Sequence, residues 1–431
     1  MRVLGLSRRL RFTVLLTALA VFAIAQTESE AQASAYKEKV IYSFCRNQDC
    51  ADGATPAASL VYVNGMLYGT TLDGGGTGCG GGGCGTVFSI DLNTGTETVL
   101  HSFLGEADGA FPQASLTVLN GFLYGTTRRG GGSGCGGNGC GTVYSIDSNT
   151  GSENVLYSFC IQQNCADGAD PWASLSLLKG KLYGTTLSGG NLVDGASYGT
   201  LFVIDPGTSA QSVVYSFCHD DQCSDGAQPV SSLINVKGTL YGTTPVGGAG
   251  EGTVFSFDPK TGIQKVLYSF GSVRPKDGVY PFAGLVKVKG TLYGTTQEGG
   301  NNSCQGFGCG TVFAIDAKTG DGGVLYSFGS QPDDGLYPQA GLLHVKGKLY
   351  GTTPSGGLPD CGSNGCGTVF AIDPDAATET ILYSFCRKQG CKDGATPSAG
   401  LIAVNGKFYG TTSAGGNYNK GTVFVLEKQH H

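Results

Sequence analysis

The stretch Leu67-Tyr68-Gly69-Thr70-Thr71 is followed by two variable residues, by Gly74-Gly75, and then by Gly85-Thr86-Val87-Phe88. This pattern of L/F-Y-G-T-T, G-G and G-T-V/L-F/Y occurs seven times along the 431 residues. Its tyrosines are Tyr68, Tyr124, Tyr183, Tyr241, Tyr293, Tyr350 and Tyr409, separated by 52 to 59 residues. A period of this length indicates a chain built from one repeated supersecondary unit.

Each repeat contains four short segments with strand character. In the first repeat they are residues 59–64, 66–72, 85–91 and 97–103. The turn between the first two is Asn-Gly or Lys-Gly in every copy, as at Asn64-Gly65, and such two-residue turns favour a β-hairpin. Four antiparallel strands in each of seven units predict an all-β fold, a seven-bladed β-propeller of four-stranded antiparallel blades. A parallel β-helix is the alternative, although its coils are usually shorter than this repeat.

The two ends of the repeat region complement each other. Residues 37–45 have the pattern of a fourth strand without the three before it, and residues 421–426 that of a third strand without a fourth. We therefore expect the N-terminal strand to complete the last blade and close the ring, which would remove open sheet edges. Residues 36–431 then form a single propeller domain with repeats of about 57 residues.

The composition agrees with this fold. The chain has 74 Gly and 15 Pro, and only 14% of its residues are charged, where about 25% is usual. Most of the Gly recur in G-T-T, G-G and G-T-V, in the hairpin turns, and in a D-G-x-x-P motif. Turn chemistry repeated in every unit therefore accounts for the glycine content better than disorder does.

The first 35 residues have the pattern of a secretory signal peptide. Four Arg precede a 14-residue apolar stretch at 12–25, and small-residue cleavage sites follow at 23–25 and 31–33. The apolar stretch is shorter than the about 20 residues that span a bilayer, so we expect no membrane span after cleavage; an uncleaved anchor is the alternative. Removal of the segment leaves 23 basic and 31 acidic residues. The signal pattern predicts a secreted, extracellular or periplasmic protein. The acidic balance predicts that this protein does not bind nucleic acid.

All sixteen cysteines fall into C-x4-C pairs. The pairs are Cys45/Cys50, Cys79/Cys84, Cys135/Cys140, Cys160/Cys165, Cys218/Cys223, Cys304/Cys309, Cys361/Cys366 and Cys386/Cys391. In an exported protein this spacing predicts eight local disulfides that each stiffen one loop. Zinc held by four thiolates from two loops is the alternative.

The L-Y-G-T-T-x-x-G-G and G-T-V-F motifs at this period resemble the bacterial extracellular tandem repeats called Gloeo/Verruco (GloVer) repeats. The resemblance covers all seven units. It implies a secreted or surface-anchored, β-propeller-like protein and carries no established activity.

The strand order predicts that the long loops gather at one end of the ring. The D-G-x-x-P loops and the Gly-Gly loops leave the blades at the same end, so this face is the expected binding face. The motif aspartates are Asp52, Asp108, Asp167, Asp225, Asp277, Asp334 and Asp393. They are expected to cap their own turns; a carboxylate ring at the channel mouth that binds Ca²⁺ is the alternative, and no other cofactor is predicted.

The residue before the proline of D-G-x-x-P varies, which allows one asymmetric patch. The ligand-binding candidates are Phe111, Asp170, Tyr280 and Tyr337 at this position, and Trp172, the only Trp. Aromatic rings beside carboxylates and amides suit sugar stacking with polar hydrogen bonds. Packing of Trp172 within its blade is the alternative.

Enzyme signatures are weak, because no G-x-S-x-G, H-E-x-x-H or Walker-type motif occurs, and we assign no catalytic residue. The carboxylates that break the repeat are Asp170, Asp194, Glu298 and Asp360. We expect a non-catalytic binding module for a glycan or for a cell-surface or extracellular protein. A carbohydrate-active enzyme that uses the unrepeated carboxylates and a structural envelope or matrix protein are the alternatives.

Overall fold

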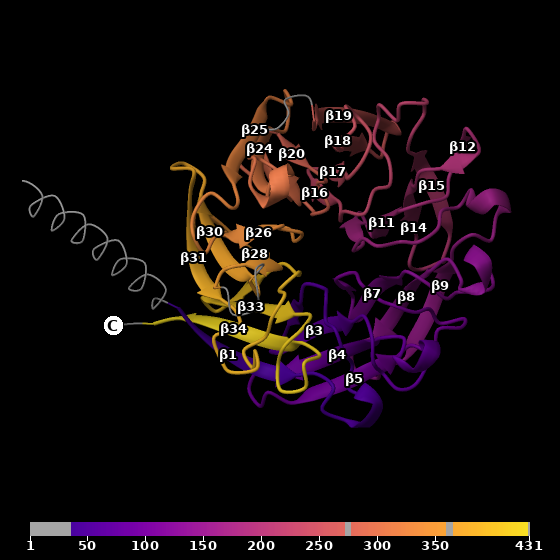
Figure 1. Ribbon diagram of the computed structural model, residues 1–431. Helices are drawn as coiled ribbons and strands as arrows, with labels where there is room; N and C mark the ends of the chain where they lie inside the picture. Colours follow the sequence, from indigo (N-terminus) through magenta and orange to yellow (C-terminus); the bar gives the residue numbers. More distant parts are fainter. Residues whose placement is uncertain (1–35, 272–276, 359–364, 430–431) are drawn as a thin grey trace, which may run out of the picture.

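The computed structural model describes residues 36–271, 277–358 and 365–429, and the predicted signal segment, residues 1–35, lies outside them. Seven four-stranded antiparallel sheets form a ring (Figure 1). Each sheet is built from strands in chain order, except the last, whose order is β1-β34-β33-β32. The predicted all-β, seven-bladed propeller is therefore confirmed.

The strands of the blades follow one scheme, from the ring axis outward. The inner strands are β2 (Val61–Val63), β6 (Thr117–Leu119), β10 (Ser176–Leu178), β16 (Ile234–Val236), β21 (Val286–Val288), β27 (Leu343–Val345) and β32 (Ile402–Val404). The second strands are β3 (Met66–Thr71), β7 (Phe122–Thr127), β11 (Lys181–Thr186), β17 (Thr239–Thr244), β22 (Thr291–Thr296), β28 (Lys348–Thr353) and β33 (Lys407–Thr412). The third strands are β4 (Thr86–Asp91), β8 (Thr142–Asp147), β14 (Thr200–Ile204), β18 (Thr253–Asp258), β24 (Thr311–Asp316), β30 (Thr368–Asp373) and β34 (Thr422–Lys428). The outer strands are β1 (Tyr36–Ser43), β5 (Glu97–Ser102), β9 (Glu153–Ser158), β15 (Gln211–Ser216), β19 (Ile263–Ser269), β25 (Gly322–Ser327) and β31 (Thr378–Ser384).

Short elements lie in the loops between these strands. A small hairpin joins β12 (Leu192–Val193) to β13 (Ala196–Ser197), and β20 (Gly278–Val279) and β26 (Gly335–Leu336) pair with β23 (Glu298–Gly299) and β29 (Ser355–Gly356). The 3-10 turns are η1 (Gln48–Cys50), η2 (Cys79–Gly81), η3 (Cys135–Gly137), η4 (Gln163–Cys165) and η5 (Cys304–Gly306). Within the described ranges, no helix has the length and apolarity needed to cross a membrane.

Turn chemistry places the long loops at one end of the ring. Asn64 and Gly65 have φ of 49° and 90°, the left-handed values that a type I′ hairpin turn requires. Because neighbouring strands are antiparallel, the tight turns between the first and second strands and between the third and outer strands lie at the same end of each blade. At the other end each D-G loop pairs with the following Gly-Gly loop, as in the bridge between Ala54 and Asp73.

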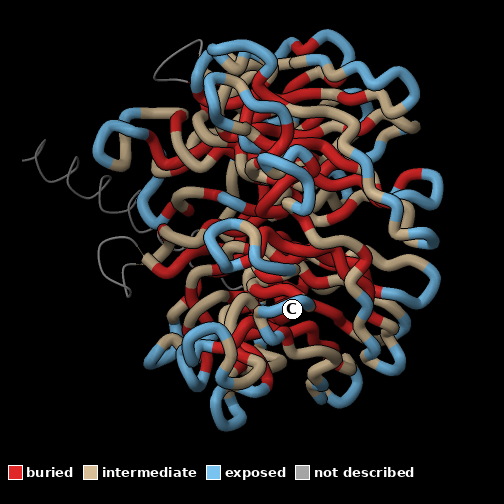
Figure 2. The backbone as a smooth tube through the Cα atoms, turned by 90° about the vertical axis from the view of Figure 1, so that its right-hand side faces the viewer, coloured by how far each residue is buried: buried red, intermediate tan, exposed pale blue. Residues whose placement is uncertain are grey.

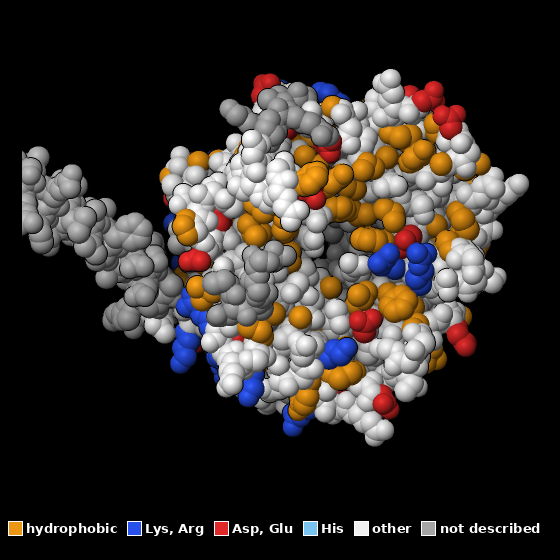
Figure 3. Space-filling view, viewed as in Figure 1, with side chains coloured by type: hydrophobic (Ala, Val, Ile, Leu, Met, Phe, Trp, Pro, Cys, Tyr) orange, Lys and Arg blue, Asp and Glu red, His pale blue; other side chains and the backbone are white. Residues whose placement is uncertain are grey.

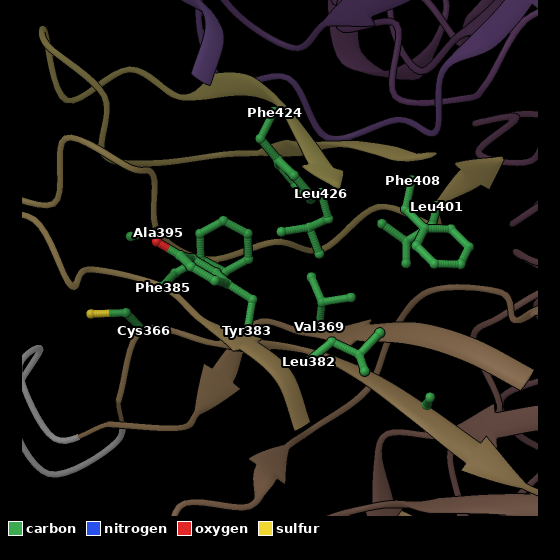
Figure 4. Close-up of a cluster of buried hydrophobic side chains, with 11 residues drawn as sticks. Cys366, Val369, Leu382, Tyr383, Phe385, Ala395, Leu401, Phe408, Phe424 and Leu426 are labelled. Carbon is green, nitrogen blue, oxygen red and sulfur yellow. The ribbon is translucent and has the colours of Figure 1, made fainter. Parts of the chain in front are cut away.

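Aromatic side chains fill the space between neighbouring blades. The Phe of each Y/H-S-F strand packs edge-to-face on the third-strand ring of the next blade, as Phe385 does on Phe424 with 5.0 Å between centroids (Figure 4). The other pairs are Phe44–Phe88, Phe103–Tyr144, Phe159–Phe202, Phe217–Phe255, Phe270–Phe313 and Phe328–Phe370. Gly69 leaves room for this ring, because a Cβ there would come within 2.6 Å of Phe88. Figure 2 shows the buried residues along the strands and the exposed ones in the turns and loops.

The two threonines of G-T-T form a buried polar layer. Thr70 donates to the backbone oxygen of Ala114 in the next blade, at 3.2 Å. Thr71 donates to the Asp73 oxygen at 2.8 Å, accepts from the Thr86 amide at 3.1 Å, and lies 2.8 Å from the Thr86 hydroxyl. A counterpart of the Thr71–Thr86 hydroxyl contact exists in each of the other six blades. The repeated threonines therefore hold each blade to itself and to its neighbour.

Replacing Thr71 by Val is expected to lower the free energy of unfolding by about 1–3 kcal/mol. The methyl group keeps the volume, but the buried Thr86 amide and hydroxyl lose their bonds to the Thr71 hydroxyl, while the Asp73 oxygen keeps its bond from the Ala54 amide. Urea denaturation measures the loss. Thr98→Val, the same change at an exposed position of β5, should alter stability by no more than about 0.5 kcal/mol. Equal effects of the two substitutions would contradict the stabilising role of the buried Thr71 hydroxyl.

The last blade joins the two ends of the described chain. β1 pairs antiparallel with β34, with Tyr36 opposite Lys428 and Ser43 opposite Thr422. The buried Glu38 carboxylate also accepts from Lys388 at 2.8 Å, in the loop that follows β31. In Figure 1 the two strands lie side by side. The N-terminal strand is therefore the outer strand of the seventh blade.

Candidate functional site

The cysteines stiffen the loop end of the ring. Seven of the eight predicted disulfides are confirmed within the described chain, and the eighth includes Cys361, which lies outside it. The confirmed bonds are Cys45–Cys50, Cys79–Cys84, Cys135–Cys140, Cys160–Cys165, Cys218–Cys223, Cys304–Cys309 and Cys386–Cys391.

Two of the cysteine loops meet. The sulfur atoms of Cys135, Cys140, Cys160 and Cys165 all lie within 4.8 Å of one another. This is the arrangement that the zinc alternative requires, although these sulfurs are bonded as two local disulfides.

The D-G aspartates cap their turns. Asp52 accepts from the Arg46 and Asn47 amides at 2.9 and 3.0 Å and from the Tyr42 hydroxyl at 2.9 Å. The Tyr–Asp bond recurs at Tyr157–Asp167, Tyr215–Asp225, Tyr268–Asp277, Tyr326–Asp334 and Tyr383–Asp393. His101 takes the place of Tyr beside Asp108, with 3.4 Å between Nε2 and Oδ2. These carboxylates contact outer-strand side chains, and a ring of them that binds Ca²⁺ stays the alternative to turn capping.

A cavity of about 340 Å³ opens where the seven D-G-x-x-P loops reach the inner strands. Its lining includes the residue after the proline from every blade: Ala57, Gln113, Trp172, Val230, Phe282, Gln339 and Ser398, joined by Gln297. Because one residue comes from each blade, the cavity lies on the ring axis at the mouth of the channel. Figure 3 shows a hollow at the centre of the ring with hydrophobic side chains around it. We call this space the channel-mouth cavity.

The channel-mouth cavity is asymmetric, because its aromatic residues come from only two blades. Trp172 is half-buried and its Nε1 donates to Asp170 Oδ1 at 2.9 Å. The Arg128 guanidinium lies 3.8 Å from the Trp172 ring centroid, and its Nε lies 3.3 Å from the same Asp170 oxygen. Arg129 approaches the second carboxylate oxygen at 3.6 Å. The buried Asp170 therefore positions Trp172 and both arginines, and the indole is held rigidly in the cavity wall.

The remaining aromatic candidates lie apart from this cavity or beside it. Tyr280 contacts the lining residue Phe282, with 6.2 Å between ring centroids, and is not itself part of the lining. Phe111 lines a separate space with Leu104 and Arg129. Tyr337 is half-buried, and its amide donates to the Cys309 oxygen.

Cys84 and Cys223 lie outside the lining of the channel-mouth cavity and, among the described residues, outside any group of cysteines that could hold a metal ion. Cys84 is buried and Cys223 is half-buried. The Cys84 backbone oxygen accepts from the Phe111 amide, in the D-G loop that leads to the next blade, at 2.8 Å. The Cys223 backbone oxygen accepts from the Gly248 amide, in the Gly-Gly loop between β17 and β18, at 2.9 Å. These two cysteines therefore hold neighbouring loops together and belong to no candidate ligand site.

The unrepeated carboxylates do not converge. Asp194 is exposed in the small hairpin between β12 and β13. Glu298 lies in β23, where its backbone is opposite Val279 of β20. Asp170 is engaged by its arginines and Trp172, and Asp360 lies outside the described residues.

Apart from Trp172, the candidates chosen from the sequence precede the proline, whereas the cavity is lined by the residue after it. The residue before the proline has a left-handed φ in all seven blades, from 57° at Thr55 to 59° at Phe111 and Asp170. This conformation is uncommon for residues other than Gly. Gln113, Val230, Gln339 and Ser398 were missed because the residues on both sides of the proline vary from blade to blade, so variability alone did not single out the position that lines the cavity.

The fold resembles those of several solved structures. The extracellular domain of a hybrid two-component system from B. thetaiotaomicron matches with a TM-score of 0.56 at 10% identity, over 92% of this chain and 40% of that one. An oligogalacturonate lyase in complex with manganese matches with a TM-score of 0.52 at 11% identity, over 92% of this chain and 97% of that one. At these identities the likeness shows the fold alone. A search of curated proteins gives no significant match.

The sequence motifs identify the family independently of the fold. The model of the Gloeobacter/Verrucomicrobia repeat matches residues 135–363 and 305–431, which together are more than half of the chain. These segments contain the L-Y-G-T-T and G-T-V-F motifs whose threonines and aromatic rings hold the blades together. The chain belongs to the Gloeobacter/Verrucomicrobia repeat family.

Proposed function

We propose that the protein is an exported, non-catalytic glycan-binding module and that its channel-mouth cavity holds the sugar. The observation that carries the proposal is the wall of this cavity, in which Trp172 and Phe282 stand among the side-chain amides of Gln113, Gln297 and Gln339. Aromatic faces pack on the apolar faces of sugar rings, and amides donate to and accept from their hydroxyls. The volume of about 340 Å³ is at the lower end of the usual range for ligand pockets.

The rigidity of the site supports a binding role. Trp172 is fixed by Asp170 and Arg128, and the loops around the cavity are stiffened by local disulfides. A preorganised wall loses little conformational freedom when a ligand binds. The disulfides also support export to an oxidising compartment, because such bonds persist there and are rare in the cytosol. An extracellular or periplasmic location follows from this proposal.

The test is the substitution of Trp172 by Ala, measured by glycan array and then by calorimetry on the best glycan. We expect the affinity to fall about tenfold or more, because a large aromatic contact is lost. Trp172→Phe keeps a six-membered aromatic face and loses the five-membered ring with its bond to Asp170, so it should retain more of the affinity than Trp172→Ala. Phe307→Ala removes an aromatic side chain that is 69% exposed elsewhere in the loops and should leave binding unchanged.

Two outcomes would contradict the proposal. An array without any glycan signal from the folded protein would exclude the binding role, and unchanged affinity in Trp172→Ala would exclude the channel-mouth cavity. Release of reducing sugars from the bound glycan would replace the non-catalytic module by the carbohydrate-active enzyme.

A further inference from the structure

A second and larger hollow lies at the rim of the ring, far from the axis. It measures about 830 Å³ and runs along β1, with walls from the loop after β31 and from the Gly-Gly loop of the last blade. Its lining includes the basic residues Lys37, Lys39, Arg46, Lys388 and Lys392, together with Asn417 and Tyr418. We call it the rim groove. Figure 3 shows Lys and Arg side chains gathered at the part of the rim where β1 and β34 lie in Figure 1.

Most of the cations of the rim groove are not neutralised. The acidic residues of its lining are Glu38 and Glu427, and each already has a partner: Glu38 pairs with Lys388 at 2.8 Å and Glu427 with Lys407 at 2.7 Å. Over the part of the chain that the structure describes, Lys37, Lys39, Arg46 and Lys392 have no ion pair. All four are exposed. The rim groove is therefore positive in a protein whose net charge is −6.

The internal repeats show that this charge is not needed for the fold. At the register position of Lys37 the other blades have Thr96, Ser152, Ala210, Ile263, Asp321 and Thr378. At that of Lys39 five of the other six blades have an uncharged residue, with Lys265 as the exception. The same strand forms in every blade without these lysines, so their concentration on β1 serves something other than strand formation.

The neighbouring residues indicate the kind of anion. Tyr418 is 47% exposed at one end of the groove, beside the exposed Asn417. An exposed ring and an amide suit the faces and hydroxyls of sugars, while the lysines and Arg46 suit carboxylate or sulfate groups. A hollow that follows the length of a strand suits an extended chain better than a flat membrane surface does.

We propose that the rim groove binds an anionic polysaccharide, a glycan chain whose sugars carry carboxylates or sulfates. This binding is separate from that at the channel-mouth cavity, because the two hollows share no lining residue. It gives the protein two contacts with a glycan matrix, one at the axis for a sugar ring and one at the rim for a charged chain.

The experiment measures binding of the mature protein to polygalacturonate, dextran sulfate and neutral dextran by affinity electrophoresis and calorimetry. We expect binding to at least one polyanion, weakening as salt rises, and none to neutral dextran. The variant Lys37→Gln, Lys39→Gln, Arg46→Gln and Lys392→Gln should lose about tenfold or more of that affinity with an unchanged melting temperature. The two polyanions distinguish a carboxylate-bearing from a sulfate-bearing chain.

A matched control removes the same charge elsewhere. Lys179, Lys237, Lys289 and Lys346 occupy the turns between the first and second strands of their blades, where other blades have Asn64, Asn120 and Asn405, and none of these lysines lines the rim groove. Replacing these four lysines by Asn should leave polyanion binding within about twofold of wild type. Equal losses in the two variants would overturn the proposal, because net charge would then explain them. So would binding to phosphatidylglycerol vesicles without binding to either polyanion. Trp172→Ala should keep its polyanion affinity, which separates this site from the channel-mouth cavity.

Discussion

A mature chain that begins at Phe44 in place of Tyr36 is expected to lose its cooperative folding transition. The deletion removes β1, which is the only strand on the outer side of β34 in its sheet. It also leaves Lys388 without Glu38 and uncovers the cluster in which Ile41 and Tyr42 pack against Val423 and Val425. Without β1, β34 becomes an exposed edge strand with apolar neighbours, and such an edge promotes association between chains. Circular dichroism should show a broad or early transition, and size-exclusion chromatography should show aggregates.

A circular permutant is the control for this deletion. In the first blade the third strand reaches the outer strand through Asp91-Leu92-Asn93-Thr94-Gly95-Thr96, with Ile90 opposite Glu97. The equivalent pair in the last blade is Leu426 and Glu38, so the same six residues can join Leu426 to Glu38. A chain that starts at Cys45 and ends at Phe44 through this turn should recover the wild-type melting temperature within a few degrees. A deletion variant that melts like wild type, or a permutant that stays aggregated, would show that β1 does not have this role.

The fold could be predicted from sequence because its determinants are local and repeated. Asn64-Gly65 predicts a turn from two adjacent residues, and the structure gives both of them a left-handed φ. The cysteine pairs were predictable for the same reason, since each loop is closed over a short sequence separation. What recurs in every unit marks the scaffold, and most of the geometry that escaped this reasoning crosses from one blade to another.

The site was harder to predict because its residues meet only when the ring closes. Trp172 was a candidate as the only Trp, but its neighbours in the channel-mouth cavity come from other blades, as Phe282 and Gln339 do. Nothing in the sequence places the residue after each proline on the axis and the residue before it against the Gly-Gly loop of the preceding blade, as Phe111 lies against Cys84. The Tyr–Asp bond at Tyr42 and Asp52 was also not predicted, since the aspartates were expected only to cap their own turns.

The outer strands of four blades carry a buried Glu carboxyl group at the same position, which was not predicted from the sequence. Glu97, Glu153, Glu379 and Glu38 occupy one register position of the outer strands, opposite Ile90, Ile146, Ile372 and Leu426. Their Oε1 atoms are buried without a hydrogen-bond partner. Two other blades have Gln at this position, and the amides of Gln211 and Gln264 donate to the backbone oxygens of Asp167 and Asp225 at 3.1 and 3.0 Å. A Gln side chain at this position therefore makes a hydrogen bond to the backbone of the D-G loop, whereas the Oε1 atom of a Glu has no partner.

Replacing Glu97 by Gln is expected to stabilise the protein at about pH 8 and to change little at about pH 5. Burial, followed by the charge of Asp52, raises the pKa of Glu97 to about 7. A raised pKa in the folded state means that stability is full below the ordinary value of 4.5 and is lost as pH rises through about 7. Gln carries no charge and can donate to the backbone oxygen of Asp52 as Gln211 does to Asp167. Because Glu97 is partly exposed, we expect a gain of only about 1–2 kcal/mol in urea denaturation at the higher pH.

The reciprocal substitution tests the cause. Gln211→Glu places a carboxyl group beside Asp167, where burial should raise its pKa in the same way, so this variant should match wild type at about pH 5 and lose about 1–2 kcal/mol at about pH 8. Glu379→Gln should give the larger gain of the two Glu→Gln variants, because burial and then the charge of Asp334 raise the pKa of Glu379 to about 8. A stability difference between Glu97→Gln and wild type that does not depend on pH would contradict the assignment, since altered packing and not a buried charge would then be its source.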